Sequence, residues 1–271
     1  MATLPKKIID RITIGIKKFQ PLLLSAKDRD VGEADTVTLI KDMLSEIFGY
    51  DKYSEVTSEY AIRGTYCDLA IKLSGKLENL IEVKAIGIEL KDNHVKQAID
   101  YAANEGIDFV ILSNGIHWQV YKVHFTKPIE KELIVELDLT KISHKSDADL
   151  KKLFLLCKEG WIRSALNDFH THQQALSRFF VGSILQTDSV LEVIRKELRR
   201  VSPDAKIDIE QLRTVLLNEV IKRDVLEGDK AIEASKKIAK SSSRLLRSQS
   251  IQKPTSEVDT KPNVVNTPTV N

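Results

Sequence analysis

Residues 66–84, YCDLAIKLSGKLENLIEVK, contain two short segments in which apolar and polar side chains alternate. Such alternation is typical of β-strands, because successive side chains of a strand point to opposite faces of the sheet. The polar run 74–79 between the two segments contains Gly75, as hairpin connections often do. The sequence therefore predicts two antiparallel strands, at 66–73 and 80–84, with one apolar face packed on a core.

The polar face of this predicted hairpin carries two carboxylates and a lysine. Asp68 lies in the first strand, and Glu82 and Lys84 lie two residues apart in the second. Cross-strand neighbours on one face lie roughly 5 Å apart, so the two carboxylates are placed to share a hard cation such as Mg²⁺. The lysine would orient an attacking water or offset charge on a phosphate. The alternative is a solvated hairpin face without chemistry, since such spacings also occur by chance.

Helical and extended patterns alternate around the hairpin and predict a mixed α/β (α+β) domain. Apolar residues recur at helical spacing over 33–48, and Gly49 follows as a stop. A strand–helix–strand unit from 80 to 112 requires a right-handed crossover and parallel pairing of its two strands. Asn114-Gly115 predicts a tight turn. The other predicted elements are strands at 53–60, 107–113, 117–123 and 132–139, the last at a sheet edge, and a helix at 92–104.

Four segments are expected along the chain. Lysines, an aspartate and an arginine interrupt the apolar residues of segment 1–32, so it is not a secretory signal. We expect a basic amphipathic helix that lies against its own domain; the alternative is binding to a membrane surface. The sheet domain, 33–142, is followed by an all-helical extension, 143–229, with helices at 148–158, 161–180, 188–200 and 208–226. The last segment, 230–271, is rich in Ser, Thr, Pro and Asn and is predicted to be a disordered basic tail.

Composition excludes several classes of protein. The net charge is only +2, but residues 230–271 carry eight Lys or Arg against three Asp or Glu, so the body is slightly acidic. Cys67 and Cys157 are the only cysteines, which gives no disulfide framework and no zinc cluster. No run approaches the ~20 apolar residues of a membrane span. A cytoplasmic protein is therefore expected. The histidines His144, His170 and His172 are expected to be surface groups rather than ligands.

The ordered set Asp68…Glu82-Val83-Lys84, followed by Gln97-Ala98-Ile99-Asp100-Tyr101, resembles the PD-(D/E)XK nuclease superfamily. Within it, the chain is similar to the N-terminal nuclease domain of type I restriction enzyme R subunits, in a RecB-like version, across roughly 33–123. The resemblance implies a restriction-endonuclease-like αβββαβ core. It also implies Mg²⁺- or Mn²⁺-dependent cleavage of DNA phosphodiesters, in restriction-modification defence or DNA processing.

The resemblance also implies roles for individual residues. Asp68 and Glu82 would bind the metal, and Glu33 stands where many relatives have an assisting acid on a helix. Lys84 would be the catalytic lysine. Gln97, as a further residue of the catalytic site, and Tyr101, four residues later on the same helix face, would contact DNA. The alternative for Tyr101 is plain packing on the sheet.

Two departures from the family bear on function. Cys67 stands where relatives often have proline. No GxxxxGK[ST] sequence is present, so we expect no nucleoside triphosphate to bind and no DNA-translocating motor in this sequence. The expected protein is then a metal-dependent DNA endonuclease without its own motor. The alternative is a weak or inactive DNA-binding module that acts with a partner. A protein partner, or a homodimer formed through the helical extension, is an additional expectation.

Overall fold

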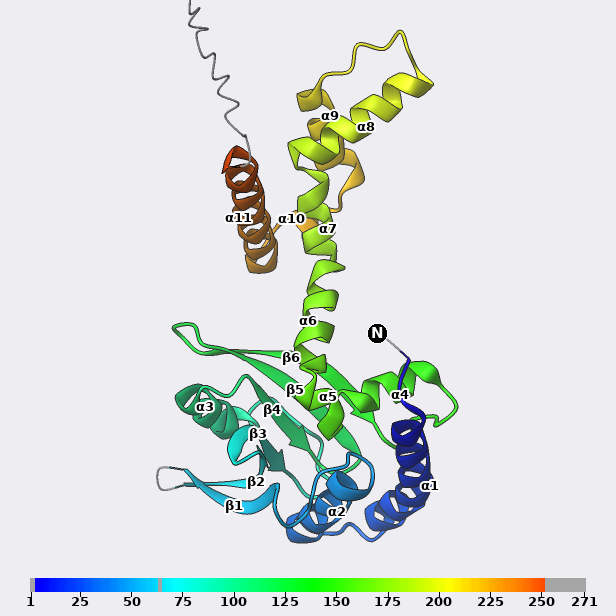
Figure 1. Cartoon of the computed structure of the whole chain (residues 1–271), viewed down its shortest axis with the longest axis vertical. Helices are drawn as coiled ribbons and strands as arrows, with labels where there is room; N and C mark the ends of the chain where they lie inside the picture. The colour runs from blue at the N-terminus through cyan, green and yellow to red at the C-terminus, as the bar shows by residue number, and fades with distance from the viewer. Residues whose placement is uncertain (1–2, 63–64, 252–271) are drawn as a thin grey trace, which may run out of the picture. The chain divides into compact units, whose positions relative to one another are not determined.

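The computed structural model describes residues 3–62 and 65–251 and divides into two compact units (Figure 1). Unit 1 extends to His170, and unit 2 begins at Thr171. The sequence placed the boundary of the helical extension near residue 142 instead. The boundary differs because the helices that directly follow the sheet share the hydrophobic core of unit 1.

Unit 1 is built on one six-stranded sheet with the strand order β1-β2-β3-β4-β5-β6. All neighbours pair antiparallel except β3 and β4, which pair in parallel. This order confirms the predicted hairpin, the parallel crossover and the edge position of the last strand. The strands are β1 (Val56–Ile62), β2 (Thr65–Leu73), β3 (Lys76–Val83), β4 (Phe109–Ser113), β5 (His117–His124) and β6 (Glu130–Asp138).

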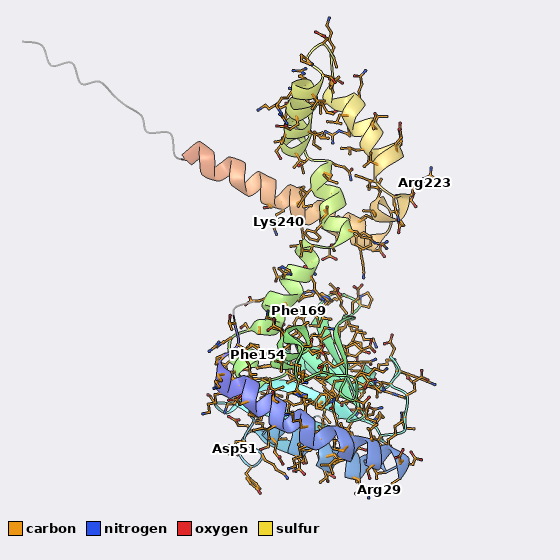
Figure 2. The ribbon with its side chains drawn as sticks, turned by 90° about the vertical axis from the view of Figure 1, so that its right-hand side faces the viewer. Arg29, Asp51, Phe154, Phe169, Arg223 and Lys240 are labelled. Carbon is orange, nitrogen blue, oxygen red and sulfur yellow. The ribbon has the colours of Figure 1, made fainter. Side chains whose placement is uncertain are left out.

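Helices cover both faces of the sheet. On one face, α1 (Lys6–Asp28) and α2 (Glu33–Glu46) contribute to the larger core, and Figure 2 shows α1 along one side of unit 1 as far as Arg29. The buried residues Ile8, Ile12 and Ile16 recur every four positions, which explains why α1 lies against its own domain as predicted. On the other face, α3 (Lys96–Glu105) packs over a smaller core. The mixed sheet flanked by helices agrees with the predicted αβββαβ order.

Three helices after the sheet belong wholly or partly to unit 1: α4 (Asp147–Phe154), α5 (Lys158–Ile162) and the first part of α6 (Ala165–Ala175). The buried side chains of Leu153 and Leu166 join the larger core. Trp161 packs edge-on against Phe109 of β4, with ring centroids 5.9 Å apart. These contacts link the segment to the sheet of unit 1.

Several predicted boundaries were displaced by local hydrogen bonds. The strand expected at 53–60 begins only at Val56, because the Asp51 carboxylate accepts the backbone N–H groups of Tyr53 and Ser54 and forms a turn. The helix expected at 161–180 is broken, because the Ser177 hydroxyl accepts the N–H of Phe180 and starts a new helix.

Unit 2 is all-helical, as predicted for this part of the chain. The helix expected at 208–226 is divided into three short pieces, one of them a π-helix. The predicted disorder from residue 230 was wrong as far as Ile251, where a helix ends; residues 252–271 lie outside the described part. The elements are α7 (Arg178–Leu185), α8 (Asp188–Val201), α9 (Ile209–Val215), η1 (Leu216–Val220, the π-helix), α10 (Arg223–Leu226) and α11 (Asp229–Ile251).

Helix α11 forms because Ala231 and Ala234 pack as buried residues on one side of it, within unit 2. Lys, Arg and Leu favour helix, and the serines at 241–243 do not interrupt it. Across the described residues, none of the helices combines the length and apolarity needed to cross a membrane.

Candidate active site

The candidate site lies where β2 and β3 separate. Their ladder runs from Leu73 to the pair Leu69–Ile81 and then stops. Strand β3 continues on its other side, where Val83 is paired with Ser113 of β4. Continuing the β2–β3 register by one residue sets Asp68 opposite Glu82, as the hairpin prediction required.

At this point the side chain of Asp68 replaces a backbone hydrogen-bond acceptor of the β2–β3 ladder. Its carboxylate Oδ2 accepts a hydrogen bond from the backbone N–H of Val83 at 2.7 Å. A side chain therefore satisfies a backbone donor that the diverging strand no longer reaches. The same hydrogen bond holds the Asp68 carboxylate beside the end of β3.

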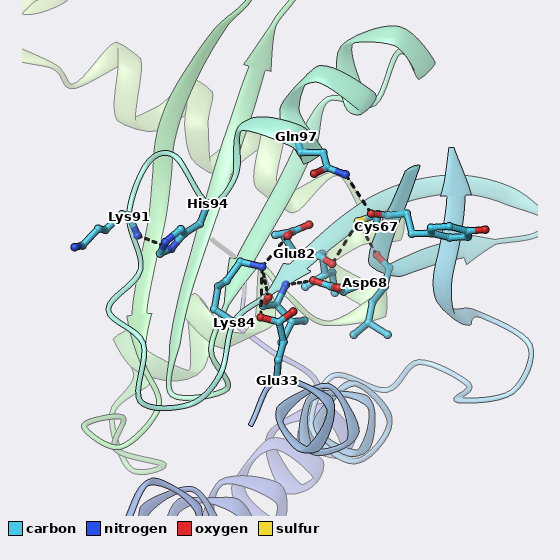
Figure 3. A network of polar contacts seen from close by, with 12 residues as sticks. Glu33, Cys67, Asp68, Glu82, Lys84, Lys91, His94 and Gln97 are labelled. Carbon is cyan, nitrogen blue, oxygen red and sulfur yellow. Dashed lines mark hydrogen bonds and ion pairs between the residues drawn. The ribbon is translucent and has the colours of Figure 1, made fainter. Parts of the chain in front are cut away.

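The ammonium group of Lys84 contacts three residues of the site, two on β3 and one on α2 (Figure 3). Its Nζ donates to Glu82 Oε1 at 2.8 Å and to the carbonyl oxygen of Val83 at 2.7 Å. Glu33 Oε2, on the first residue of α2, lies 3.6 Å from the same nitrogen. A helix far away in the sequence thus brings the third acid of the predicted set to the hairpin.

Burial and like charge perturb the site electrostatically. The Glu82 side chain is only 14% exposed. Burial raises the pKa of Glu82, the Lys84 hydrogen bond opposes that rise, and the charge of Asp68 adds to it. Burial alone would lower the pKa of Lys84, but the hydrogen bond to Glu82 and the charges of the acids raise it above its ordinary value. The lysine is therefore a cation at neutral pH.

The two predicted DNA-contacting residues lie on α3. Gln97 Nε2 donates to the hydroxyl oxygen of Tyr101 at 3.0 Å and to the carbonyl oxygen of Tyr66 on β2 at 3.4 Å. Gln97 is exposed, and Tyr101 is half-buried against the smaller core. Tyr101 therefore both packs against the smaller core and accepts a hydrogen bond from Gln97. The Gln97 amide lies at the surface beside β2.

The donor set matches a hard divalent cation in kind. Asp68 and Glu82 offer carboxylate oxygens, and burial, with a smaller contribution from the charge of Asp68, raises the pKa of Glu82; a bound cation would favour its charged form. In the parts of the chain that the structure describes, His, Cys, Asp and Glu side chains form no group of three or more that could hold a metal ion. An ion here would therefore need backbone or water oxygens besides the two carboxylates.

Two nearby residues were not fully anticipated from the sequence. Cys67 is buried, and burial raises the pKa of its thiol to about 12, so the thiol keeps its proton at neutral pH. His94, in the turn before α3, accepts the backbone N–H of Lys91 at Nδ1, 3.2 Å away, which leaves Nε2 as a donor. Its position three residues before Gln97 was the signal that would have drawn attention to it.

Comparison with known proteins gives one match. Residues 39–138 match the family model described as type I restriction enzyme R protein N terminus. No curated protein and no solved structure matches the chain. The matched segment includes most of α2, all six strands and α3, together with Asp68, Glu82 and Lys84, whereas Glu33 and all of unit 2 lie outside it. Residues 39–138 of this chain are therefore similar to the N-terminal region of type I restriction enzyme R proteins, and this similarity covers the sheet domain but not unit 2.

Proposed function

We propose that unit 1 hydrolyses DNA phosphodiester bonds with a divalent metal ion, Mg²⁺ or Mn²⁺. The observation that carries the proposal is the position of the Lys84 ammonium, 2.8 Å from Glu82 and 3.6 Å from Glu33, beside the strand that carries Asp68. A protein that only binds DNA has no need of this acid–acid–lysine arrangement. The match of residues 39–138 to a restriction-enzyme family supports a role in restriction-modification defence or DNA processing.

Asp68 and Glu82 would hold the metal, with Glu33 as an additional acid from α2. Such an ion, when bound, polarises the phosphate and activates water for attack. Lys84 keeps its proton because its pKa is raised, so it offsets charge that develops on the phosphate rather than acting as a base. Gln97 and Tyr101 would contact the DNA and position the phosphodiester.

The test is a cleavage assay on supercoiled, linear double-stranded and single-stranded DNA, with Mg²⁺, with Mn²⁺ and with a chelator. Asp68→Ala, Glu82→Ala and Lys84→Ala should each lower the cleavage rate by roughly 10² or more. The matched control is Glu78→Ala, which removes a carboxylate four residues earlier on the same strand. Metal-dependent cleavage that survives in all three variants would overturn the assignment of the site.

A DNA-binding module on the same fold is the second candidate. It is favoured by the small acid set, since no group of three or more potential metal ligands occurs in the described segments. In that case the wild-type protein would bind DNA with a steep dependence on salt but would not cut it alone. If cleavage appears only when a partner protein is added, the protein is a nuclease that depends on that partner, and the binding-module hypothesis is wrong.

A further inference from the structure

Helix α11 of unit 2 carries most of its positive charge on one side. Lys236 and Lys240 lie four residues apart on this helix and are exposed (Figure 2). Arg244 and Arg247 continue the same spacing along the helix. At about 100° per residue, the four positions lie within about 80° of one another around the helix axis and span roughly 16 Å along it. We call these four residues the α11 basic stripe.

The opposite side of α11 packs within unit 2, against α7 and α10. Ala231 and Ala234 are buried there, about 140° and 160° around the helix axis from Lys236. Lys237 lies at the border of the packed side, where its ammonium nitrogen is 3.3 Å from the side-chain oxygen of Gln174 on α6. The contacts that hold α11 in unit 2 therefore leave the side of Lys236 uncovered.

Acids of the chain do not neutralise the lysines of the stripe. Among the described side chains, Lys236 and Lys240 form no ion pair with a carboxylate. Both acids of α11 lie within its first five residues, before the stripe, and one of them, Glu233, is paired with Lys237 at 2.7 Å. No acid follows in residues 234–251. The helix dipole favours bases only in the last turn, so it does not account for the lysines in the middle of the helix.

The stripe belongs to the basic part of the chain. Residues 171–251 contain 15 Lys or Arg and 11 Asp or Glu, whereas residues 1–170 contain 24 Lys or Arg and 26 Asp or Glu. Unit 1, which we propose to cleave DNA, is thus slightly acidic overall and attracts phosphate weakly. A basic surface elsewhere in the same chain would raise the local concentration of DNA for unit 1.

The residue types of α11 favour duplex DNA over other anionic partners. Proteins that bind single strands stack bases on aromatic side chains, and α11 contains no Phe, Tyr or Trp. A helix that lies on a membrane needs a face of large apolar residues, whereas the described side chains of α11 expose one such residue, Ile232. Bases at intervals of about 6 Å along a helix suit the phosphates of a duplex instead.

We propose that the α11 basic stripe binds the phosphate backbone of double-stranded DNA without sequence preference and so holds the substrate for unit 1. The choice of DNA as the partner rests on the proposed function of unit 1. The stripe itself lies outside the segment that resembles restriction enzyme R proteins. Contacts of Lys and Arg to phosphates position a protein on a duplex but do not read its bases, which is why no sequence preference is expected.

The experiment measures binding of the full chain to a short fluorescent DNA duplex by anisotropy, with a chelator present so that the duplex stays uncut. The affinity is followed across a range of NaCl concentrations. The stripe variant is Lys236→Gln/Lys240→Gln/Arg244→Gln/Arg247→Gln. It should bind at least about 10-fold more weakly at physiological salt, and its slope of log affinity against log salt should be shallower by about 3–4, because each lost phosphate contact removes about 0.9 from the slope.

The matched control removes four exposed lysines of unit 1 and has the same net charge as the stripe variant: Lys6→Gln/Lys7→Gln/Lys17→Gln/Lys145→Gln. Its salt slope should change by less than about 1. Glutamine favours helix about as well as lysine and arginine, so circular dichroism should report unchanged helix content. If the stripe variant loses helix, the double variant Lys236→Gln/Lys240→Gln replaces it, with about half of the change in slope.

A wild type that does not bind the duplex overturns the proposal. So does a stripe variant that binds as tightly as the wild type, or a control variant that weakens binding equally. Duplex RNA of the same length and vesicles that contain phosphatidylserine are tested beside the DNA. Tighter binding to either of them would assign the stripe to a different class of partner and would also overturn the proposal.

Cleavage kinetics separate this proposal from the nuclease function. The stripe variant should need at least about 10-fold more DNA to reach half of its maximal cleavage rate, while the maximal rate stays that of the wild type. Asp68→Ala should lose cleavage and keep its binding to the duplex. A wild type that binds DNA through the stripe but never cuts it would contradict the nuclease proposal alone. A stripe variant that cuts dilute DNA as fast as the wild type would contradict the stripe proposal alone.

Discussion

The Asp68 carboxylate accepts the backbone N–H of Val83 at 2.7 Å and so joins β2 to β3 just beyond the end of their ladder. A residue proposed as a metal ligand therefore also closes the sheet at the site. The two roles make different demands on the side chain, because a neutral amide oxygen can accept the hydrogen bond but is a poorer ligand for a hard cation.

Substitutions of Asp68 should separate these roles. Asp68→Asn keeps an acceptor for the Val83 N–H and should abolish cleavage with little loss of stability. Asp68→Ala leaves that N–H without its partner and should lower the free energy of unfolding by about 1–3 kcal/mol as well. Urea denaturation of the metal-free proteins, beside the cleavage assay, measures both effects. Equal stability of the two variants would show that the hydrogen bond does not hold the strands.

Glu82 should be destabilising in the metal-free protein at neutral pH. Its pKa is raised in the folded state, so the folded protein holds the proton more tightly than the unfolded chain does. Stability is therefore lost as pH rises from the unfolded pKa, about 4.3, through the higher folded pKa. Glu82→Gln should raise the thermal midpoint at pH 7 by a few degrees, and the difference should vanish well below pH 4. Lys84→Met is the opposing control, since it removes the compensating cation and should lower the midpoint.

The Arg11–Glu159 ion pair should stabilise the packing of α1 against α5. The guanidinium donates to both carboxylate oxygens, at 2.7 and 2.6 Å, and to the carbonyl oxygen of Ile47 at 3.0 Å. Arg11→Ala should destabilise unit 1 by about 2–3 kcal/mol at pH 7. Arg11→Lys should not restore this, because an ammonium group cannot make the two parallel hydrogen bonds.

The contribution of the Arg11–Glu159 ion pair to stability depends on pH through the ionisation of Glu159. Burial acts to raise the pKa of Glu159, but the hydrogen bonds and charge of Arg11 bring it below its ordinary value. The contribution is therefore complete above the unfolded pKa of about 4.3 and is lost as pH falls through the lower folded pKa. Denaturation of Arg11→Ala and wild type from pH 7 to pH 3 should show the two curves converging at the acid end.

Glu132 on β6 should anchor α6 to the sheet. One of its carboxylate oxygens, Oε2, contacts His170 Nε2 at 3.0 Å and His124 Nε2 at 3.2 Å. Burial acts to raise the pKa of Glu132, and the hydrogen bonds of the two histidines lower it overall. Glu132→Ala should therefore cost about 1–3 kcal/mol at neutral pH, with a smaller cost once pH falls below the wild-type pKa. His172→Ala, at an exposed position two residues past His170, is the control and should change stability little.

His170 also corrects the sequence interpretation, which placed it among surface histidines. It is only 8% exposed, because α6 lies against the β5–β6 pair at that point. Helical periodicity around residue 170 does not reveal this, since the partner carboxylate is 38 residues away in the chain. The same reasoning applies to the boundary between the units, which depends on contacts between α4–α6 and the sheet.

The alternation of 66–84 and the crossover from 80 to 112 determined, by themselves, the hairpin, the parallel pair and the face shared by Asp68 and Glu82. These are properties of strand period and chain connectivity, so they need no knowledge of distant contacts. Only the tertiary structure decided that α2 brings Glu33 to Lys84, that the β2–β3 ladder ends at Leu69, one residue before Asp68, and that burial raises the pKa of Glu82. Each of these features depends on how elements far apart in the sequence pack together. The local pattern of apolar and polar residues does not determine that packing.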